Sequence, residues 1–82
     1  MYIFRCTFIL IEYNNIATNM FIRSLDKESA EAGSIEIFQT QCFKYGIYNA
    51  KFVQEVRLSS EEEMGQYLLN MKNNDKTRTM VN

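Results

Sequence analysis

The segment from Tyr2 to Glu12 constrains the fold most, because it is an almost unbroken run of residues that favour β-strands. Its sequence, YIFRCTFILIE, consists largely of β-branched and aromatic residues. Successive side chains of a strand point to opposite faces of the sheet. One face gathers Phe4, Cys6, Phe8 and Leu10, and the other gathers Ile3, Arg5, Thr7, Ile9 and Ile11. We therefore predict a β-strand here. The run lacks the basic start and cleavage site of a signal peptide and is too short to span a bilayer.

Asn14 and Asn15 follow this strand and predict a turn, because asparagine tolerates the left-handed backbone of tight hairpins. We expect a return strand from about Ile16 to Arg23. Its two faces carry Thr18, Met20 and Ile22 on one side and Ala17, Asn19, Phe21 and Arg23 on the other. The two strands together predict an antiparallel hairpin.

The register of this hairpin depends on the loop length. A two-residue loop pairs Phe8 with Phe21 and mixes polar side chains into the apolar face. A three-residue loop, or a bulge, pairs Phe8 with Met20 and Cys6 with Ile22, which keeps one face apolar. A one-residue slip moves every side chain to the opposite face, so burial favours the second register.

A helix is predicted from Lys27 to about Phe43, with Ser24 and Asp26 as candidate capping residues. Its expected buried stripe is Ala30, Gly33, Ile37, Phe38, Gln41 and Cys42. We expect Gly33 to mark a close approach to the sheet and Gly46 to end the helix in a left-handed conformation. Residues 34–38 also read as a strand, and the sequence leaves open whether residues 34–43 are helix or strand.

A third strand is predicted from about Ala50 to Leu58, with Phe52, Val56 and Leu58 on one face and Lys51, Val53, Glu55 and Arg57 on the other. Ser60 followed by Glu63 forms a capping box ahead of a last helix. Its apolar residues at helical spacing are Met64, Tyr67, Leu68 and Met71. The order β-β-α-β-α predicts a small α+β domain over residues 1–72, an antiparallel sheet with helices packed on it. Residues 73–82 are expected to form a flexible tail.

The charge of the chain is balanced, with nine lysines and arginines against ten acidic residues. This balance argues against non-specific nucleic-acid binding and against a polybasic membrane anchor. Cys6 and Cys42 are the only cysteines. Both fall on predicted core faces, so we expect inert buried thiols and a cytoplasmic protein, with a disulfide between them as the alternative.

Catalytic chemistry is poorly supported by the residue types present. The chain has no histidine, the commonest general base at neutral pH and the usual partner of a cysteine nucleophile. Glu61, Glu62 and Glu63 open a predicted helix, where they complement its dipole. The three glycines are isolated, so no phosphate loop exists. We therefore expect no enzyme, no cofactor and no metal site.

The sheet face opposite the first helix is predicted to be basic and apolar at once. The preferred register places Arg5 directly opposite Arg23, and like charges in that position destabilise a sheet unless an anion lies between them. The candidate binding residues on this face are Arg5, Ile9, Phe21, Arg23, Val53 and Arg57. The sequence leaves open which of three things covers this face. It could be the last helix, with Glu61 and Glu63 facing the arginines, or a partner protein, including a second copy of the chain. The third alternative is RNA or single-stranded DNA.

A second cluster of aromatic residues follows the first helix, in the sequence FKYGIYN that begins at Phe43. We expect Phe43 and Ile47 to plug the end of the core. Tyr45 and Tyr48 are then the exposed candidates for binding.

These observations predict a non-enzymatic regulatory protein that binds and modulates a partner protein. The abundance of isoleucine and asparagine, together with the absence of tryptophan, proline and histidine, indicates an AT-rich coding source. With the small size, this composition fits an inhibitor or accessory protein of a phage or mobile element, possible as a homodimer. The alternative is a small RNA-binding or single-stranded-DNA-binding module that uses the basic aromatic face.

Overall fold

The structure is a computed structural model that describes the backbone of residues 1–81 and the side chains of residues 1–72. Its elements are β1 (Tyr2–Leu10), β2 (Ile16–Ser24), α1 (Lys27–Lys44), β3 (Phe52–Ser59) and α2 (Glu61–Val81). The predicted order β-β-α-β-α and the α+β class are confirmed. The backbone of α2 continues to Val81, and the side chains of residues 73–82 lie outside what the structure describes. The expected flexible tail therefore stays a prediction.

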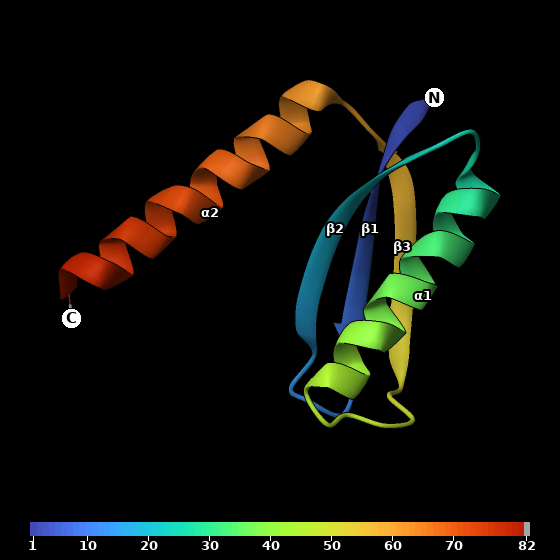
Figure 1. The fold of residues 1–82 in the computed structure, drawn as a ribbon, viewed down its shortest axis with the longest axis horizontal. Coiled ribbons are helices and arrows are strands. Elements are labelled where there is room, and N and C mark those ends of the chain that lie inside the picture. Colours follow the sequence, from blue (N-terminus) through green and yellow to red (C-terminus); the bar gives the residue numbers. More distant parts are fainter. Residues whose placement is uncertain (82) are drawn as a thin grey trace.

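The sheet has three strands in the order β2-β1-β3, and β1 is antiparallel to both neighbours. The strand richest in apolar residues thus occupies the centre, where both edges are paired. The edge strands β2 and β3 run parallel to each other, and α1 connects them across one face of the sheet (Figure 1). The opposite face is contacted at one end by the start of α2.

The register of the hairpin differs from the predicted one by two residues. Cys6 lies opposite Met20, and Phe8 lies opposite Thr18. The loop spans residues 11–15 and is longer than expected because two successive turns close it: the amide of Tyr13 donates to the carbonyl of Leu10, and the amide of Ile16 donates to the carbonyl of Tyr13. A shift of two residues preserves the faces, so the prediction of one apolar face is confirmed.

The predicted turn at Asn14 and Asn15 is confirmed, since both residues have positive φ, 58° and 54°. The amide of Ile16 donates to the carbonyl of Tyr13, which closes the turn around them. Asparagine is one of the few residues that tolerates two consecutive left-handed positions.

The core lies between the sheet and α1. Its buried members from β1 are Phe4, Cys6, Phe8 and Leu10, and those from α1 are Ala30, Phe38 and Cys42. Phe8 and Phe38 stack with their ring centroids 4.4 Å apart. Phe52 from β3 meets both rings edge-on. Both cysteines are free and buried, as expected from their positions, and burial raises the pKa of each thiol.

Residues 34–43 are helical, which resolves the ambiguity of that segment. The buried positions of α1 follow a spacing of four residues: Ala30, Ser34, Phe38 and Cys42. The predicted inclusion of Ile37 and Gln41 is therefore wrong, and both side chains are exposed. Ser34 replaces them because its hydroxyl group accepts a hydrogen bond from Gln54 on β3 and donates one to the carbonyl of Glu31.

The ends of α1 agree with the sequence. Asp26 accepts a hydrogen bond from the amide of Ser29 at 2.7 Å, and this bond lowers the pKa of the Asp26 carboxyl group. Gly46 follows the C-cap Tyr45 with φ of 77°, the left-handed position predicted for it. Gly33 lies against the sheet, since a Cβ atom there would come within 3.2 Å of Ile22 Cδ1.

The last helix, α2, does not lie along the sheet. It starts beside the end of β3 and then projects away past β2 (Figure 1). Among the residues whose side chains are described, those of its first two turns contact the sheet. This arrangement separates the far face of the sheet into a covered end and an uncovered end.

Candidate protein-binding surface

A carboxylate from α2 links two arginines at the covered end of the sheet. Arg5 on β1 lies directly opposite Arg57 on β3. Glu63 accepts hydrogen bonds from both, at 3.2 Å from Arg5 Nη1 and 3.0 Å from Arg57 Nη1, and also from the hydroxyl group of Ser59. Glu63 forms ion pairs with the two guanidinium groups. The anion expected between like charges is therefore part of the same chain.

These contacts shift the ionisation of Glu63. Hydrogen bonds from Arg57, Ser59 and Arg5 lower the pKa of its carboxyl group to about 2. The hydrogen bonds that Arg57 donates to Glu63 also raise the pKa of the Arg57 guanidinium group. Glu63 is therefore an anion at neutral pH.

The start of α2 places Glu63 for this role. Ser60 caps the helix, and its hydroxyl group accepts a hydrogen bond from the Glu63 amide at 3.1 Å. The predicted capping box is only half formed, because the Glu63 carboxylate binds arginines instead of reaching back to the Ser60 amide. A charge-assisted contact with a guanidinium group is stronger than one with a neutral amide, which explains the difference.

The remaining arginine of the predicted face also contacts α2. Arg23 Nη2 lies 3.0 Å from Glu61 Oε1 in an exposed ion pair. It does not lie opposite Arg5, as the predicted register required; Phe21 takes that position and Arg23 lies opposite Ile3. The two-residue shift of the hairpin accounts for this correction.

Aromatic rings complete the covered end. The Arg5 guanidinium carbon lies 5.8 Å from the centroid of the Phe21 ring and 5.3 Å from that of Tyr67. The two rings are 5.4 Å apart, which anchors α2 to β2. Arg5 is thus held between a carboxylate and two aromatic faces, both favourable for a guanidinium group.

Of the three kinds of cover that the sequence leaves open, the last helix covers this end of the sheet. Glu61 and Glu63 face the arginines as expected. The opposite end, which we call the open sheet surface, has no such cover among the described residues and consists of Ile9, Ala17, Val53 and Glu55. Ile9 lies between Ala17 and Val53 in register, and Val53 is 46% exposed.

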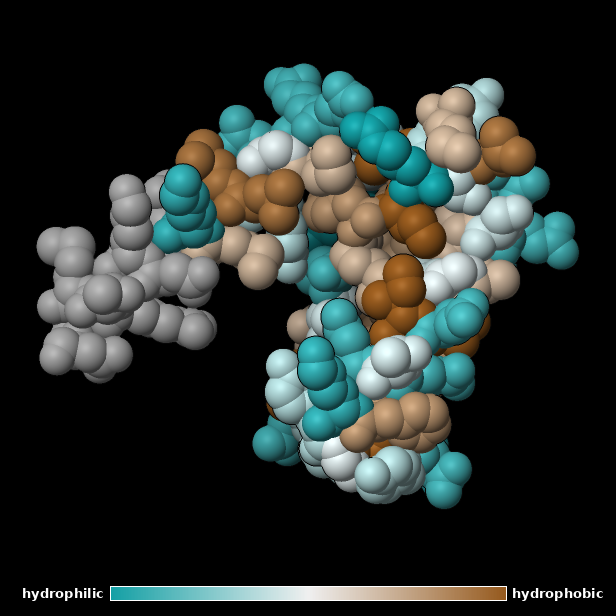
Figure 2. Space-filling model, viewed as in Figure 1, coloured by the Kyte–Doolittle hydropathy of each residue, from teal (hydrophilic) through white to brown (hydrophobic). Residues whose placement is uncertain are grey.

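A second apolar surface lies on α2 itself. The apolar residues at helical spacing, which we call the α2 stripe, are Met64, Tyr67, Leu68 and Met71. Tyr67 contacts Phe21, but Leu68 is 56% exposed and Met71 is 48% exposed. Figure 2 shows apolar side chains gathered on this part of α2, with open space between the helix and the lower part of the molecule. Exposed leucine and methionine side chains gathered in this way are typical of interaction surfaces.

The predicted binding residues therefore fall into three groups. Arg5, Phe21, Arg23 and Arg57 lie together at the covered end, where they contact α2. Ile9 and Val53 lie side by side on the open sheet surface. Tyr45 and Tyr48 are exposed, as predicted, in the loop between α1 and β3.

The aromatic loop differs from the prediction in one residue. Ile47 packs against the core as expected, whereas Phe43 is 56% exposed. Phe43 stacks on Tyr48 with the ring centroids 5.6 Å apart. It is excluded from the core because Cys42, one position earlier, takes the buried side of α1.

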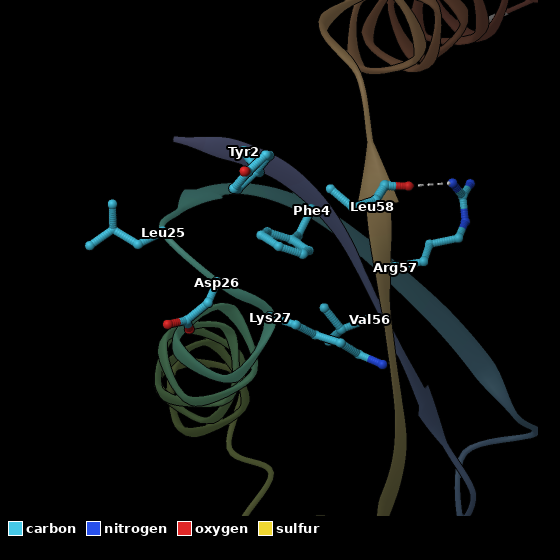
Figure 3. A pocket seen from close by; sticks show the side chains of 8 residues that line it. All are labelled: Tyr2, Phe4, Leu25, Asp26, Lys27, Val56, Arg57 and Leu58. Carbon is cyan, nitrogen blue, oxygen red and sulfur yellow. Dashed lines mark hydrogen bonds between the residues drawn. The ribbon is translucent and has the colours of Figure 1, made fainter.

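Sequence reasoning missed a cavity of about 420 Å³ at the start of α1. Phe4 and Val56 form its floor, and Tyr2, Leu25 and Leu58 form its walls (Figure 3). Lys27 extends across it, whereas Arg57 points to the far side of β3. The exposed Leu25, immediately before the cap of α1, is the only signal in the sequence that could have indicated it.

The part of the chain that the structure describes shows no cluster of residues suited to hold a metal ion. Neither α1 nor α2, over the residues searched, is long and apolar enough to cross a membrane. No family model, curated protein or solved structure matches the chain. The surfaces described above are consequently the basis for assigning a function.

Proposed function

We propose that this chain is a non-enzymatic regulatory protein that binds a partner protein through the open sheet surface and the α2 stripe. The observation that carries the proposal is the position of α2, which leaves its own apolar residues and half of a sheet face exposed at once. Apolar surfaces of this kind on a small protein are typical of interaction sites.

The charged residues support a protein partner over a nucleic acid. The three arginines of the sheet face are paired with two carboxylates, Glu61 and Glu63, so most of their charge is offset within the chain. Phe21, the ring best placed to stack on a base, instead contacts Tyr67. A nucleic acid would have to displace α2 before it met these residues. Binding of RNA or single-stranded DNA is therefore the competing outcome of the experiment below.

A role without catalysis is supported by the same contacts. The chain has no histidine, and Glu63 is held as an anion with a pKa of about 2, too low for a general base at neutral pH. The two free, buried cysteines support action in a reducing compartment such as the cytoplasm. The composition supports the finer proposal of a phage or mobile-element accessory factor.

The test is a comparison of surface variants in a capture experiment. Leu68→Gln and Val53→Thr reduce the apolar surface while they retain good helix and strand propensity. Ile37→Gln on the outer side of α1 is the matched control, because Ile37 is exposed to a similar degree, 45%. Proteins bound by the wild-type chain should be lost with Leu68→Gln and Val53→Thr, retained with Ile37→Gln, and unaffected by ribonuclease.

The opposite pattern would contradict the proposal. Capture that disappears with ribonuclease and with Arg23→Ala, but survives Leu68→Gln, would identify a nucleic-acid-binding module instead.

A further inference from the structure

We propose that the partner at this surface is a second copy of the chain, in a two-fold dimer in which α2 of each copy lies on the open sheet surface of the other. The inference rests on the proposed function and specifies its partner. It follows from the shape of the chain, from the charges along the sheet and α2, and from the way α2 is anchored.

The chain exposes more surface than a compact protein of its mass. Its accessible surface is 6311 Å², whereas a folded monomer of 9.7 kDa is expected to expose about 5,100 Å². Its radius of gyration is 14.1 Å against an expected value of about 12 Å. The excess of about 1,200 Å² is more than the roughly 800 Å² that each partner of a standard interface buries. A dimer that covers residues 61–72 of α2 and the open sheet surface reduces this exposed area.

The charges of the sheet face and of α2 complement each other. The sheet is basic at the covered end, at Arg5 and Arg57. Beyond them on the same face, Glu55 is exposed and makes no ion pair within residues 1–72, whereas Lys51 at the far end pairs with Glu12. The helix starts with three glutamates and reaches a basic residue, Lys72, one turn beyond Leu68 on the same side. The acidic start of α2 matches the basic end of its own sheet, and Lys72 of a second α2 matches Glu55.

A chain cannot place its own α2 on its open sheet surface in this conformation. Two ion pairs, Arg23 with Glu61 and Arg57 with Glu63, fix the first turn. The contact between Phe21 and Tyr67 fixes the second. From that point α2 continues as one uninterrupted helix that leads away from the sheet (Figure 1). Leu68 and Met71 can therefore reach a sheet only on another molecule.

Two-fold symmetry satisfies both unpartnered surfaces at once. Each copy donates one α2 stripe and accepts one, so both of these surfaces are covered within the pair. This closure distinguishes the dimer from open-ended association through the edges of the sheet.

The first test is the mass of the full chain in sedimentation equilibrium over a range of concentrations. We expect a monomer–dimer equilibrium that ends at two chains. Leu68→Gln and Val53→Thr should each raise the dissociation constant about tenfold or more, since buried apolar anchors dominate such interfaces. Ile37→Gln should leave the constant unchanged. A wild-type chain that stays monomeric at every concentration would overturn the inference.

The second test identifies the surfaces in contact. Chains carrying Val53→Cys are mixed with chains carrying Leu68→Cys under mild oxidation, and the native cysteines do not interfere because both are buried. A disulfide-linked dimer of one chain of each type supports the exchange of helices, because a disulfide needs its Cα atoms within about 7 Å. Dimers linked only between like chains would contradict it.

The experiments distinguish a failure of the dimer from a failure of the proposed function. A monomer with a radius of gyration near 14 Å, whose capture of another protein depends on Leu68, refutes the second copy and retains the proposed function. A monomer in which α2 has folded back onto its own sheet, shown by an intramolecular disulfide in the Val53→Cys, Leu68→Cys double variant, refutes both.

Discussion

Arg5 and Arg57 lie directly opposite each other on adjacent strands, and the carboxylate of Glu63 binds both. Two cations in this position repel each other, so the sheet and the start of α2 depend on one another. The cluster fixes the direction in which α2 leaves the sheet. It therefore also determines which apolar surfaces stay exposed.

Glu63→Gln should lower the melting temperature and loosen α2. The substitution keeps the shape of the side chain but removes the negative charge between Arg5 and Arg57. Glu62→Gln is the matched control, because Glu62 is exposed and makes no ion pair within the described part of the chain. Thermal unfolding and hydrogen exchange of residues 61–67 measure the two effects. Equal behaviour of the two variants would refute the role of Glu63.

Acid should destabilise the protein through the same residue. The pKa of Glu63 is lowered from 4.5 to about 2 in the folded state, so the folded protein binds a proton less readily than the unfolded chain. The resulting stabilisation is fully present above pH 4.5 and is lost as the pH falls towards 2. Urea unfolding between pH 5 and pH 2 should show this loss in the wild type and a smaller loss in Glu63→Gln. Identical pH profiles would contradict the assignment.

Phe38→Ala should destabilise the domain by about 3–5 kcal/mol, the usual cost of removing a buried aromatic side chain. Phe38 stacks on Phe8 and contacts Phe52, so the truncation leaves a cavity at the centre of the core. Ile37→Ala, one position earlier, is the control and should change the stability by less than about 0.5 kcal/mol. The free energies of unfolding of the two variants are measured in urea. Comparable losses would mean that α1 is rotated about its axis relative to the structure.

The effect of Gly33→Ala on the free energy of unfolding should depend on the residue at position 22. Alanine favours the helix by about 1 kcal/mol over glycine, but its Cβ atom would come within 3.2 Å of Ile22 Cδ1. In an Ile22→Val background that methyl group is absent, so the gain should appear there in full. A double-mutant cycle measures the coupling. Additive effects would show that Gly33 does not lie close to the sheet.

RNA should not alter the mass of the protein. The arginines of the sheet face are engaged by Glu61 and Glu63, and the chain carries no excess of positive charge. If RNA does bind, Arg23→Ala should flatten the salt dependence of the affinity. Fluorescence anisotropy of a labelled RNA at low and high salt decides between the two outcomes.

The elements of the fold could be predicted from the sequence because local signals specify them. The strand propensity of Tyr2–Leu10, the positive φ of Asn14 and Asn15, and the cap at Asp26 each act within a few residues. The register of the hairpin could not be predicted. It depends on the length of the loop at residues 11–15, which two successive turns close, and the strand propensity of Ile11 and Glu12 does not indicate that β1 stops pairing at Leu10.

The residues of the candidate site could be predicted from the sequence, but their arrangement in space could be predicted only in part. Alternation in the strands places Arg5, Arg57 and Val53 on one face, and helical spacing identifies the α2 stripe. The direction of α2 depends on the long-range contacts of Glu63 and Tyr67, which no local pattern encodes. The same limit applies to Phe43, whose exposure follows from the rotation of α1 about its axis.

Light scattering over a concentration series, with and without RNA, tests most directly the central claim that the surface formed by α2 and the sheet binds protein. We predict that the mass rises from that of one chain towards that of two as the concentration increases, and that RNA does not change it. In Leu68→Gln this rise should occur at a higher concentration, whereas in Ile37→Gln it should occur at the same concentration as in the wild type. A mass of one chain at every concentration that rises only when RNA is added, and returns to that of one chain in high salt, would contradict the account.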